Sequence, residues 1–477
     1  MAKETVEAIV KGVVSGDIEA VKDEIKTTFA RTIGLSGVVI ISLSAMLPGI
    51  FVTPTFAADI MGPGIWLAFL LAAAVVLPAA LSKSELASGM PSSGGSYVFL
   101  ERTYGPLFGT ISGLGLWASF LLKSAFSLIG FSAYFIVITT FFDIEMNMLT
   151  LSLSALVLIT TVNLLGVSKI KTIQTPIVVT TVGLLLGMCI MALFDPNFDA
   201  SVPIDGAFSA SIWSLAETAG FVFVAYAGVT KVAAIGDEVK DPERNLPSGI
   251  LLSLAIATVI YSILAFMMMA AIPGDWWISD GKVVEDPISV FAAALAGSTF
   301  GVFVAIISVL TMISMALAGI LASSRFLFAM ARDKLISPRL EAMNSKYETP
   351  HWAILVTGLA MGMAILLLPL KDVVKLASGF KIMIFIMINS CVIILRQTSD
   401  THEWDPAYRS PLYPYMQLWG IIAGCFLISL MGSKAFIGGT VAVVAGVITY
   451  YVYGRKHYEV HRETPFQAFR ATLRKQS

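Results

Sequence analysis

Two long apolar stretches are each interrupted by residues that weaken a helix. The first contains Pro48 and Gly49, and the second, five stretches later, contains Gly228. Proline lacks a backbone donor and clashes with the preceding turn, and glycine weakens a helix further. A helix broken there exposes N–H groups, which attract a carboxylate, and carbonyls, which attract an ammonium group or Na⁺. The interruptions predict a mid-membrane solute site, although they are also compatible with simple kinks or close packing.

Charged residues within apolar stretches are the second chemical signal. They are Lys123, Glu217, Lys231 and Lys381. A charge near the bilayer centre costs roughly 2.5–3.5 kcal/mol on insertion scales, so each needs a partner, a cavity or a function. Lys231 and then Lys123 are the coupling candidates, because an ammonium there would replace bound sodium, neutralise an acidic substrate or exchange protons. The alternative is snorkelling or an ion pair, for Lys231 with Glu217; Lys381 and Glu217 are expected to be structural.

Hydroxyl groups offer an alternative coupling site. Thr311 and Ser314 share a helix face with Ser308 and would suit sodium, although such hydroxyls more often bond to their own helix carbonyls. The cysteines and histidines lack ligand spacing, so no metal site is predicted. We expect no cofactor beyond a coupling ion, H⁺ or Na⁺.

The elements that must position these residues are membrane-spanning helices. The chain of 477 residues is 57% hydrophobic and 13% charged, against about 25% charged in soluble proteins. Apolar runs of about twenty residues, long enough to cross a bilayer as helices, recur along it without strand-like alternation. The pattern predicts an all-α polytopic membrane protein. Its twelve expected spans are Gly34–Ala58, Gly64–Ser82, Gly95–Phe142, Leu149–Val167, Ile173–Phe194, Ser211–Ile235, Gly249–Ile272, Phe300–Met330, Ala353–Leu370, Val373–Leu395, Tyr415–Met431 and Ala435–Tyr453.

The ends of the chain are predicted to be cytoplasmic. Residues 1–31 have the apolar spacing of an amphipathic surface helix, residues 32–455 form the transporter domain, and residues 456–477 form a tail. Basic residues concentrate in one set of loops, as expected for the cytoplasmic side. These residues are Lys83, Lys169, Lys171, Lys240, Arg244, Arg332, Lys334, Arg339 and Lys346. We therefore expect a multi-pass protein of the cytoplasmic membrane.

Several motifs resemble those of amino acid–polyamine–organocation (APC) permeases, in the order found in that family and over nearly the whole chain. The first, Pro48-Gly49-Ile50-Phe51, is similar to the end of the glycine-rich first-helix motif. The others are Ser84-Glu85-Leu86-Ala87, Pro91 to Tyr97, Tyr104-Gly105-Pro106, Glu238 to Pro247, Ser324-Arg325 and Ala329 to Asp333.

The resemblance implies a fold of the leucine-transporter type. In it, two inverted repeats of five helices, here residues 34–194 and 211–395, are followed by two more helices within 412–453. The implied site has carbonyls of Ala45, Val224 and Ala227 facing a substrate ammonium, and N–H groups of Gly49 and Ile50 facing a carboxylate. The remaining implied substrate-binding residues are Ser44, Met46, Tyr97, Tyr226 and Gly228.

Two departures from the family pattern bear on the mechanism. Leu47-Pro48 replaces a smaller, more glycine-rich sequence, so one backbone donor to a carboxylate is missing, although proline suits the first turn of a helix. A lysine that a proton-coupled subgroup carries in the fifth span is absent from Val178–Gly183. The coupling mechanism of that subgroup therefore does not transfer directly.

The predicted function is secondary active transport of amino acids by alternating access, ion-coupled or by exchange. No GxxxxGK[ST] nucleotide loop is present in the sequence. A polyamine or metabolite antiporter of the same fold is the alternative; a membrane-embedded enzyme or a channel is more remote, because no catalytic cluster or filter-like sequence appears. The expected partners are a small molecule and the lipid bilayer, not nucleic acid, and no enzyme activity is expected.

Overall fold

The computed structural model describes most of the chain. The described residues are 33–90, 95–166, 170–229, 231–234, 236–344, 346–347, 349–399, 404–458 and 464–469. The predicted amphipathic segment 1–31, the Pro91–Gly94 part of the family motif, Lys169 and most of the tail lie outside these residues.

The described chain is helical, with one short hairpin of β1 (Ile278–Ser279) and β2 (Lys282–Val283). Among the residues that the structure describes, seven helical stretches are long and apolar enough to cross a membrane. They are Thr53–Gly89, which contains α4 (Thr53–Met61) and α5 (Ile65–Gly89), then α7 (Pro106–Phe141), Gln174–Ala192 in α9 (Ile170–Ala192), α12 (Pro242–Ala271), α14 (Ser298–Arg332), α16 (Leu370–Gln397), and Phe436–His457, which covers most of α19 (Ser433–Thr449) and α20 (Arg455–His457).

Shorter apolar helices complete the bundle. Two of them, α10 (Ser201–Ser209) and α11 (Ile212–Tyr226), meet at a bend of 110° and together would make an eighth span. The others are α3 (Leu35–Met46), α8 (Met148–Leu164), α13 (Pro287–Ala296), α15 (His351–Leu367) and α18 (Tyr415–Leu430).

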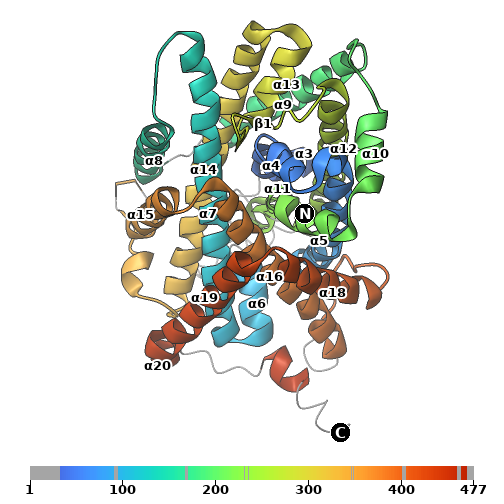
Figure 1. Cartoon of the computed structure of the whole chain (residues 1–477). Helices are drawn as coiled ribbons and strands as arrows, with labels where there is room; N and C mark the ends of the chain where they lie inside the picture. Colours follow the sequence, from blue (N-terminus) through green and yellow to red (C-terminus); the bar gives the residue numbers. More distant parts are fainter. Residues whose placement is uncertain are drawn as a thin grey trace, which may run out of the picture.

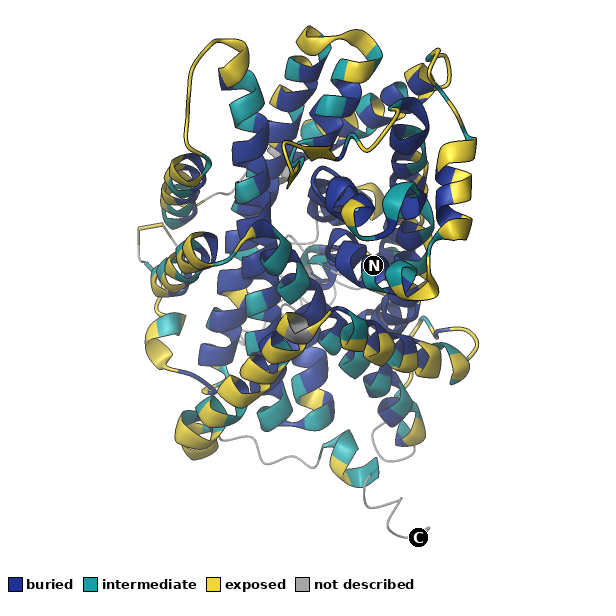
Figure 2. Cartoon of the chain, viewed as in Figure 1, coloured by how far each residue is buried: buried dark blue, intermediate teal, exposed yellow. Residues whose placement is uncertain are grey.

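The helices surround a centre formed by α3, α4 and α11, with α8 and α15 at one rim and α10 at the other (Figure 1). Burial follows this arrangement, because the centre is buried and the rim helices are exposed on one face (Figure 2). The exposed rim positions are apolar, for example Val157 in α8, Leu359 in α15 and Phe208 in α10. Exposed apolar side chains of this density are suited to contact with lipid.

The structure corrects three details of the sequence prediction. The expected span Gly95–Phe142 is two helices, α6 (Ser96–Tyr104) and α7, because Gly105 adopts a φ of +93° that ends the first. Lys83 does not lie in a loop, since α5 continues past it and its side chain is only 3% exposed. Helices α10 and α13 and the β1–β2 hairpin were not predicted.

Helices α7 and α14 approach each other closely at Gly319. A Cβ atom on this glycine would lie 1.7 Å from Oγ of Ser124. The hydroxyl of Ser127, one turn further along α7, donates to the carbonyl of Met312 in α14 at 2.8 Å. Small residues that let two backbones approach are a common basis of helix packing in membranes. This contact fixes the position of Lys123, which precedes Ser124.

Candidate substrate site at two helix interruptions

The first predicted interruption is present between α3 and α4. Helix α3 ends at Met46, a 3₁₀ turn covers Leu47–Gly49, and α4 begins at Thr53. The hydroxyl of Thr53 donates to the carbonyl of Gly49 at 2.8 Å. The N–H of Ile50 donates to the carbonyl of Leu47 at 3.1 Å. In this conformation it is therefore not the free donor to a substrate carboxylate that the family resemblance implies.

The second interruption follows α11, which ends at Tyr226. The chain then turns, with the N–H of Ala227 donating to the carbonyl of Val224 at 3.1 Å and that of Val229 to Tyr226 at 3.0 Å. A 3₁₀ segment, η3 (Lys231–Ala234), comes next. The regular i→i−4 pattern is lost here, so carbonyls at the end of α11 are available to other donors.

The two interruptions meet backbone to backbone. A Cβ atom added to Gly49 would lie 2.4 Å from Cα of Ala225, and one added to Gly228 would lie 2.4 Å from the carbonyl oxygen of Ala45. Only glycine permits approaches this close, because real Cβ contacts are never so short. Of the residues predicted to form one site, Ala45 and Gly228 are thus in direct contact, and Gly49 packs against Ala225 beside them.

The meeting point is closed to solvent in this conformation. Met46, Ile50 and Val224 have no exposed surface, Ser44 is 6% exposed and Ala227 is 3% exposed. The hydroxyl of Ser44 is directed to its own helix, donating to the carbonyl of Ile41 at 2.8 Å. A solute reaches these atoms only after the two helices separate.

Lys123 places its amino group at this point. Its Nζ donates to the carbonyl of Val224 at 2.9 Å and lies 3.5 Å from that of Ala225. Its side chain is 1% exposed. One of the carbonyls expected to face a substrate ammonium is therefore occupied by the amino group of Lys123. From the sequence, Lys231 was preferred to Lys123 as the coupling candidate. In the structure, Lys123 is the one whose side chain contacts the interruption. The position of Lys123 within an apolar run was the sequence feature that could have indicated this.

The two predicted tyrosines point away from the interruptions. The hydroxyl of Tyr226 donates to the carbonyl of Phe69 in α5 at 3.1 Å, and its ring lies 5.2 Å from that of Tyr261. The hydroxyl of Tyr97 donates to Oδ2 of Asp333 at 2.7 Å, which joins α6 to the end of α14. Their contribution to substrate binding stays a prediction.

The hydroxyl candidates of α14 lie on a buried face. Oγ1 of Thr311 is 2.9 Å from Oγ1 of Thr181 in α9 and also donates to the carbonyl of Ile307 at 2.8 Å. Ser308 bonds back to Val304 at 2.8 Å, and Ser314 is 9% exposed. The role of these hydroxyls in coupling stays a prediction.

The sequence suggested Glu217 as an ion-pair partner of Lys231. In the structure, Glu217 pairs with a different lysine. Its Oε1 accepts from Nζ of Lys375 in α16 at 3.1 Å. Lys231 follows the turn, and its own N–H donates to the carbonyl of Gly228 at 2.9 Å. Lys381 is 1% exposed, and its ammonium lies over the rings of Phe120 and Phe385 at 4.6 and 5.3 Å.

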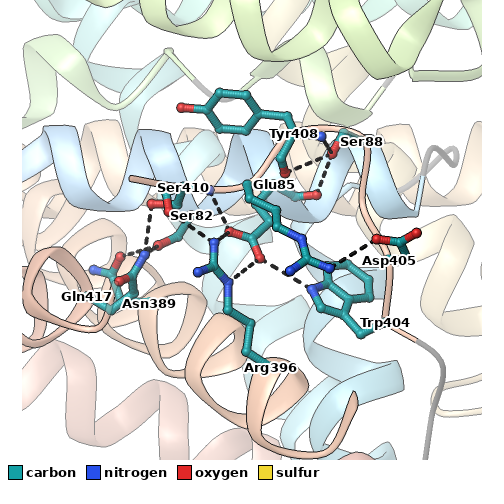
Figure 3. Close-up of polar contacts among 11 residues, drawn as sticks. Ser82, Glu85, Ser88, Asn389, Arg396, Trp404, Asp405, Tyr408, Ser410 and Gln417 are labelled. Carbon is teal, nitrogen blue, oxygen red and sulfur yellow. Dashed lines mark hydrogen bonds and ion pairs between the residues drawn. The ribbon is translucent and has the colours of Figure 1, made fainter. Parts of the chain in front are cut away.

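A carboxylate network that the sequence did not predict joins α5 and α16 to the segment 404–410 (Figure 3). Both oxygens of Glu85 accept from the guanidinium of Arg396, at 2.8 and 2.6 Å. Oε2 also accepts from the backbone N–H of Ser410 at 2.8 Å, and Oε1 from the indole of Trp404 at 3.3 Å. Glu85 is buried, so this network fixes the connection between α16 and α18 against α5.

A separate set of contacts joins the first interruption to α13 and to the segment before it. The hydroxyl of Tyr134 in α7 donates to the carbonyl of Phe51 and accepts from the N–H of Ile288 in α13 at 3.2 Å. The hydroxyl of Thr55 in α4 donates to the carbonyl of Val284 at 2.6 Å. Together α13 and the segment before it hold the start of α4 in place.

Asp286, at the start of α13, makes this cover sensitive to pH. It borders two cavities of about 390 and 420 Å³, and burial raises the pKa of its carboxyl from 3.8 to about 6. Burial likewise raises the pKa of its neighbour Glu285. Burial of Asp286 in the packed segment 284–290 favours the protonated acid. The contribution of Asp286 to the stability of this segment is therefore greatest below pH 3.8 and falls as the pH rises through about 6.

We predict that Asp286→Asn removes the contribution of Asp286 to this pH dependence. Hydrogen exchange of the amides of residues 284–290 is compared between the wild-type and variant proteins at each pH, which cancels intrinsic rates. The ratio of wild-type to variant exchange should rise between pH about 4 and 6 and then level off. A ratio that stays constant over this range would contradict the prediction.

Comparison with known proteins places this geometry in a family. Residues 37–466 match the family described as amino acid permease. The branched-chain amino acid permease BcaP of Bacillus subtilis (strain 168) is 27% identical over 454 residues, covering 91% of this chain and 95% of that protein. The methylthioribose transporter of the same organism is 25% identical, covering 90% and 95%, and its serine/threonine exchanger SteT is 26% identical, covering 80% and 87%. The chain belongs to the amino acid permease family, within the APC superfamily.

Proposed function

We propose that this permease is a secondary active transporter that moves amino acids across the cytoplasmic membrane by alternating access. The proposal includes the twelve-helix arrangement, with two inverted repeats of five helices and both termini in the cytoplasm. It is supported by the family membership and by the relatives BcaP and SteT, which are named for amino acid transport or exchange.

The observation that carries the proposal is the contact between the two interruptions. Gly49 faces Ala225 and Gly228 faces the carbonyl of Ala45. Interrupted helices in the membrane core present main-chain donors and acceptors that suit the two charges of an amino acid. Because both lie in a closed core, substrate binding requires the helices to part, as alternating access demands.

Polyamine or metabolite exchange is the second candidate, and one relative is named a methylthioribose transporter. A polyamine site needs carboxylates to neutralise several ammonium groups. Lys123 contacts the interruption, and its positive charge would repel such a substrate. This contact favours a substrate that carries a carboxylate.

The driving force is proposed to be a proton or sodium gradient, or exchange. Lys123 and Lys231 are the candidates for a proton-linked step, and Thr311 with Ser314 for a sodium-linked one. The neighbouring hydroxyl of Thr181, 2.9 Å from that of Thr311, would add an oxygen to a sodium site between α9 and α14.

Uptake into proteoliposomes tests the function. Purified protein is reconstituted, and radiolabelled amino acids are offered under an imposed proton gradient, an imposed sodium gradient, or with unlabelled amino acid inside. We expect saturable uptake above that of empty liposomes in at least one regime. Monodisperse protein that transports no amino acid in any of the three would overturn the proposal.

A further inference from the structure

Three buried or half-buried lysines gather around the end of α11. We call Lys123 of α7, Lys231 of η3 and Lys381 of α16 the lysine cluster. Lys123 contacts the carbonyl of Val224, Lys231 follows the turn at Gly228, and Lys381 lies one turn after Ser378, whose hydroxyl contacts α11. Phe223 of α11 packs against Phe385 of α16 with ring centroids 5.6 Å apart, and Ser378 of α16 donates to the carbonyl of Phe221. Helix α11, which Lys123 contacts, and α16, which carries Lys381, thus pack against each other.

The cluster lacks a compensating acid among the residues that the structure describes. There, the ion pairs formed by lysines of α16 are Lys371 with Asp59 and Lys375 with Glu217, and neither belongs to the cluster. Lys123 is held by carbonyls and Lys381 by aromatic rings. Several buried positive charges without a described carboxylate are costly, and an anionic ligand would lower that cost.

The contact of Lys123 also bears on how a substrate would fit. Its Nζ takes the carbonyl of Val224, the place suited to a substrate ammonium. An incoming amino acid must displace it, and the displaced cation then needs a new partner. A carboxylate on the side chain of the substrate would supply that partner, so that the substrate replaces both interactions that it breaks.

We infer that this permease selects amino acids with a side-chain carboxylate, the class of aspartate and glutamate, and that Lys123 determines this preference. The inference rests on the proposed transport function. In the bound state the substrate ammonium takes the carbonyl of Val224, and Lys123 pairs with the side-chain carboxylate. Lys381 and Lys231 add positive charge around the same group.

The first test uses the wild-type protein and matched substrates. Proteoliposomes are assayed for uptake of radiolabelled glutamate and glutamine, which differ in one neutralised group, and each is competed with unlabelled aspartate, asparagine and leucine. Thermal stabilisation of the detergent-solubilised protein by the same compounds gives a binding readout that needs no reconstitution. We expect glutamate to exceed glutamine by about tenfold or more in apparent affinity.

The second test uses variants. Lys123→Met should lower the apparent affinity for glutamate by about tenfold or more while that for glutamine changes little, and Lys123→Arg should preserve the preference. Lys371→Met, which breaks an exposed ion pair with Asp59, is the matched control and should leave the preference unchanged. If Lys123→Met does not fold, Lys381→Met tests the effect of the same positively charged cluster. It should lower the apparent affinity for glutamate and leave that for glutamine nearly unchanged.

The outcomes separate this inference from the proposed function. Uptake of glutamine or leucine without transport of, or competition by, glutamate overturns the inference and leaves amino acid transport intact. An unchanged preference in folded Lys123→Met refutes the role of that residue. Failure of every amino acid to be transported or to stabilise the protein overturns both proposals.

Discussion

Alanine at Gly49 or Gly228 should reduce uptake by about tenfold or more, because the added methyl group cannot be accommodated. A Cβ atom would lie 2.4 Å from the backbone of Ala225 in the first case and 2.4 Å from the carbonyl oxygen of Ala45 in the second. Overpacking of a tight core costs about 1–3 kcal/mol, and here the obstructing atoms are main-chain atoms that no rotamer change can move. The closed conformation is destabilised, so the transport cycle loses one of its states.

Initial uptake rates normalised to reconstituted protein measure this effect, with size-exclusion profiles to verify folding. Gly187→Ala is the matched control, since this glycine lies in α9 and a Cβ there would meet no atom within 4 Å. It should transport at nearly the wild-type rate. Wild-type rates in both Gly49→Ala and Gly228→Ala would show that the backbone contact does not matter for transport.

Glu85→Gln should lower stability strongly. The carboxylate accepts four hydrogen bonds, including a bidentate pair from Arg396, and it has no exposed surface. The amide keeps the shape but presents an NH₂ group to donors and removes the negative charge that faces the guanidinium of Arg396. Breaking a buried ion pair by removing one partner costs about 3–5 kcal/mol. The midpoint of thermal unfolding in detergent should fall by several degrees.

Asp405→Asn provides the control, because Asp405 pairs with Arg409 in the same segment while remaining 91% exposed. An exposed pair of this kind contributes about 0–1 kcal/mol, so its loss should hardly change the midpoint. Equal midpoints for Glu85→Gln and the wild-type protein would contradict the importance of the network.

The sequence predicted the helices and their weak points because these depend on local properties. Apolar runs and the Pro48-Gly49 pair report directly on span positions and on where a helix ends. Gly105 was harder to interpret, since one glycine with a positive φ separates α6 from α7 within a continuous apolar run. Lys83 was misplaced for a related reason, because an isolated lysine at the end of an apolar run resembles a loop residue.

The partners of side chains were not accessible from local sequence. Lys123 and Val224 are 101 positions apart, and Glu85 and Arg396 are 311 apart. Their contacts depend on how α7 lies beside α11 and how α16 crosses α5. Pairing Lys231 with Glu217 failed on the same ground, since proximity in the chain does not predict that Lys375 reaches Glu217 from α16. The free-energy cost of burying a charged side chain indicates which charges need partners, but it does not indicate which residue is the partner.

A seal made of main-chain atoms has an evolutionary consequence. Gly49 and Gly228 contact atoms that every amino acid possesses, so mutation of the surrounding side chains leaves the barrier to leakage in place. A substitution at Lys123 would therefore leave this main-chain contact in place. Relatives about a quarter identical carry names as different as branched-chain amino acid permease and methylthioribose transporter. A change of substrate among such relatives would therefore not have required a new barrier to leakage across the membrane.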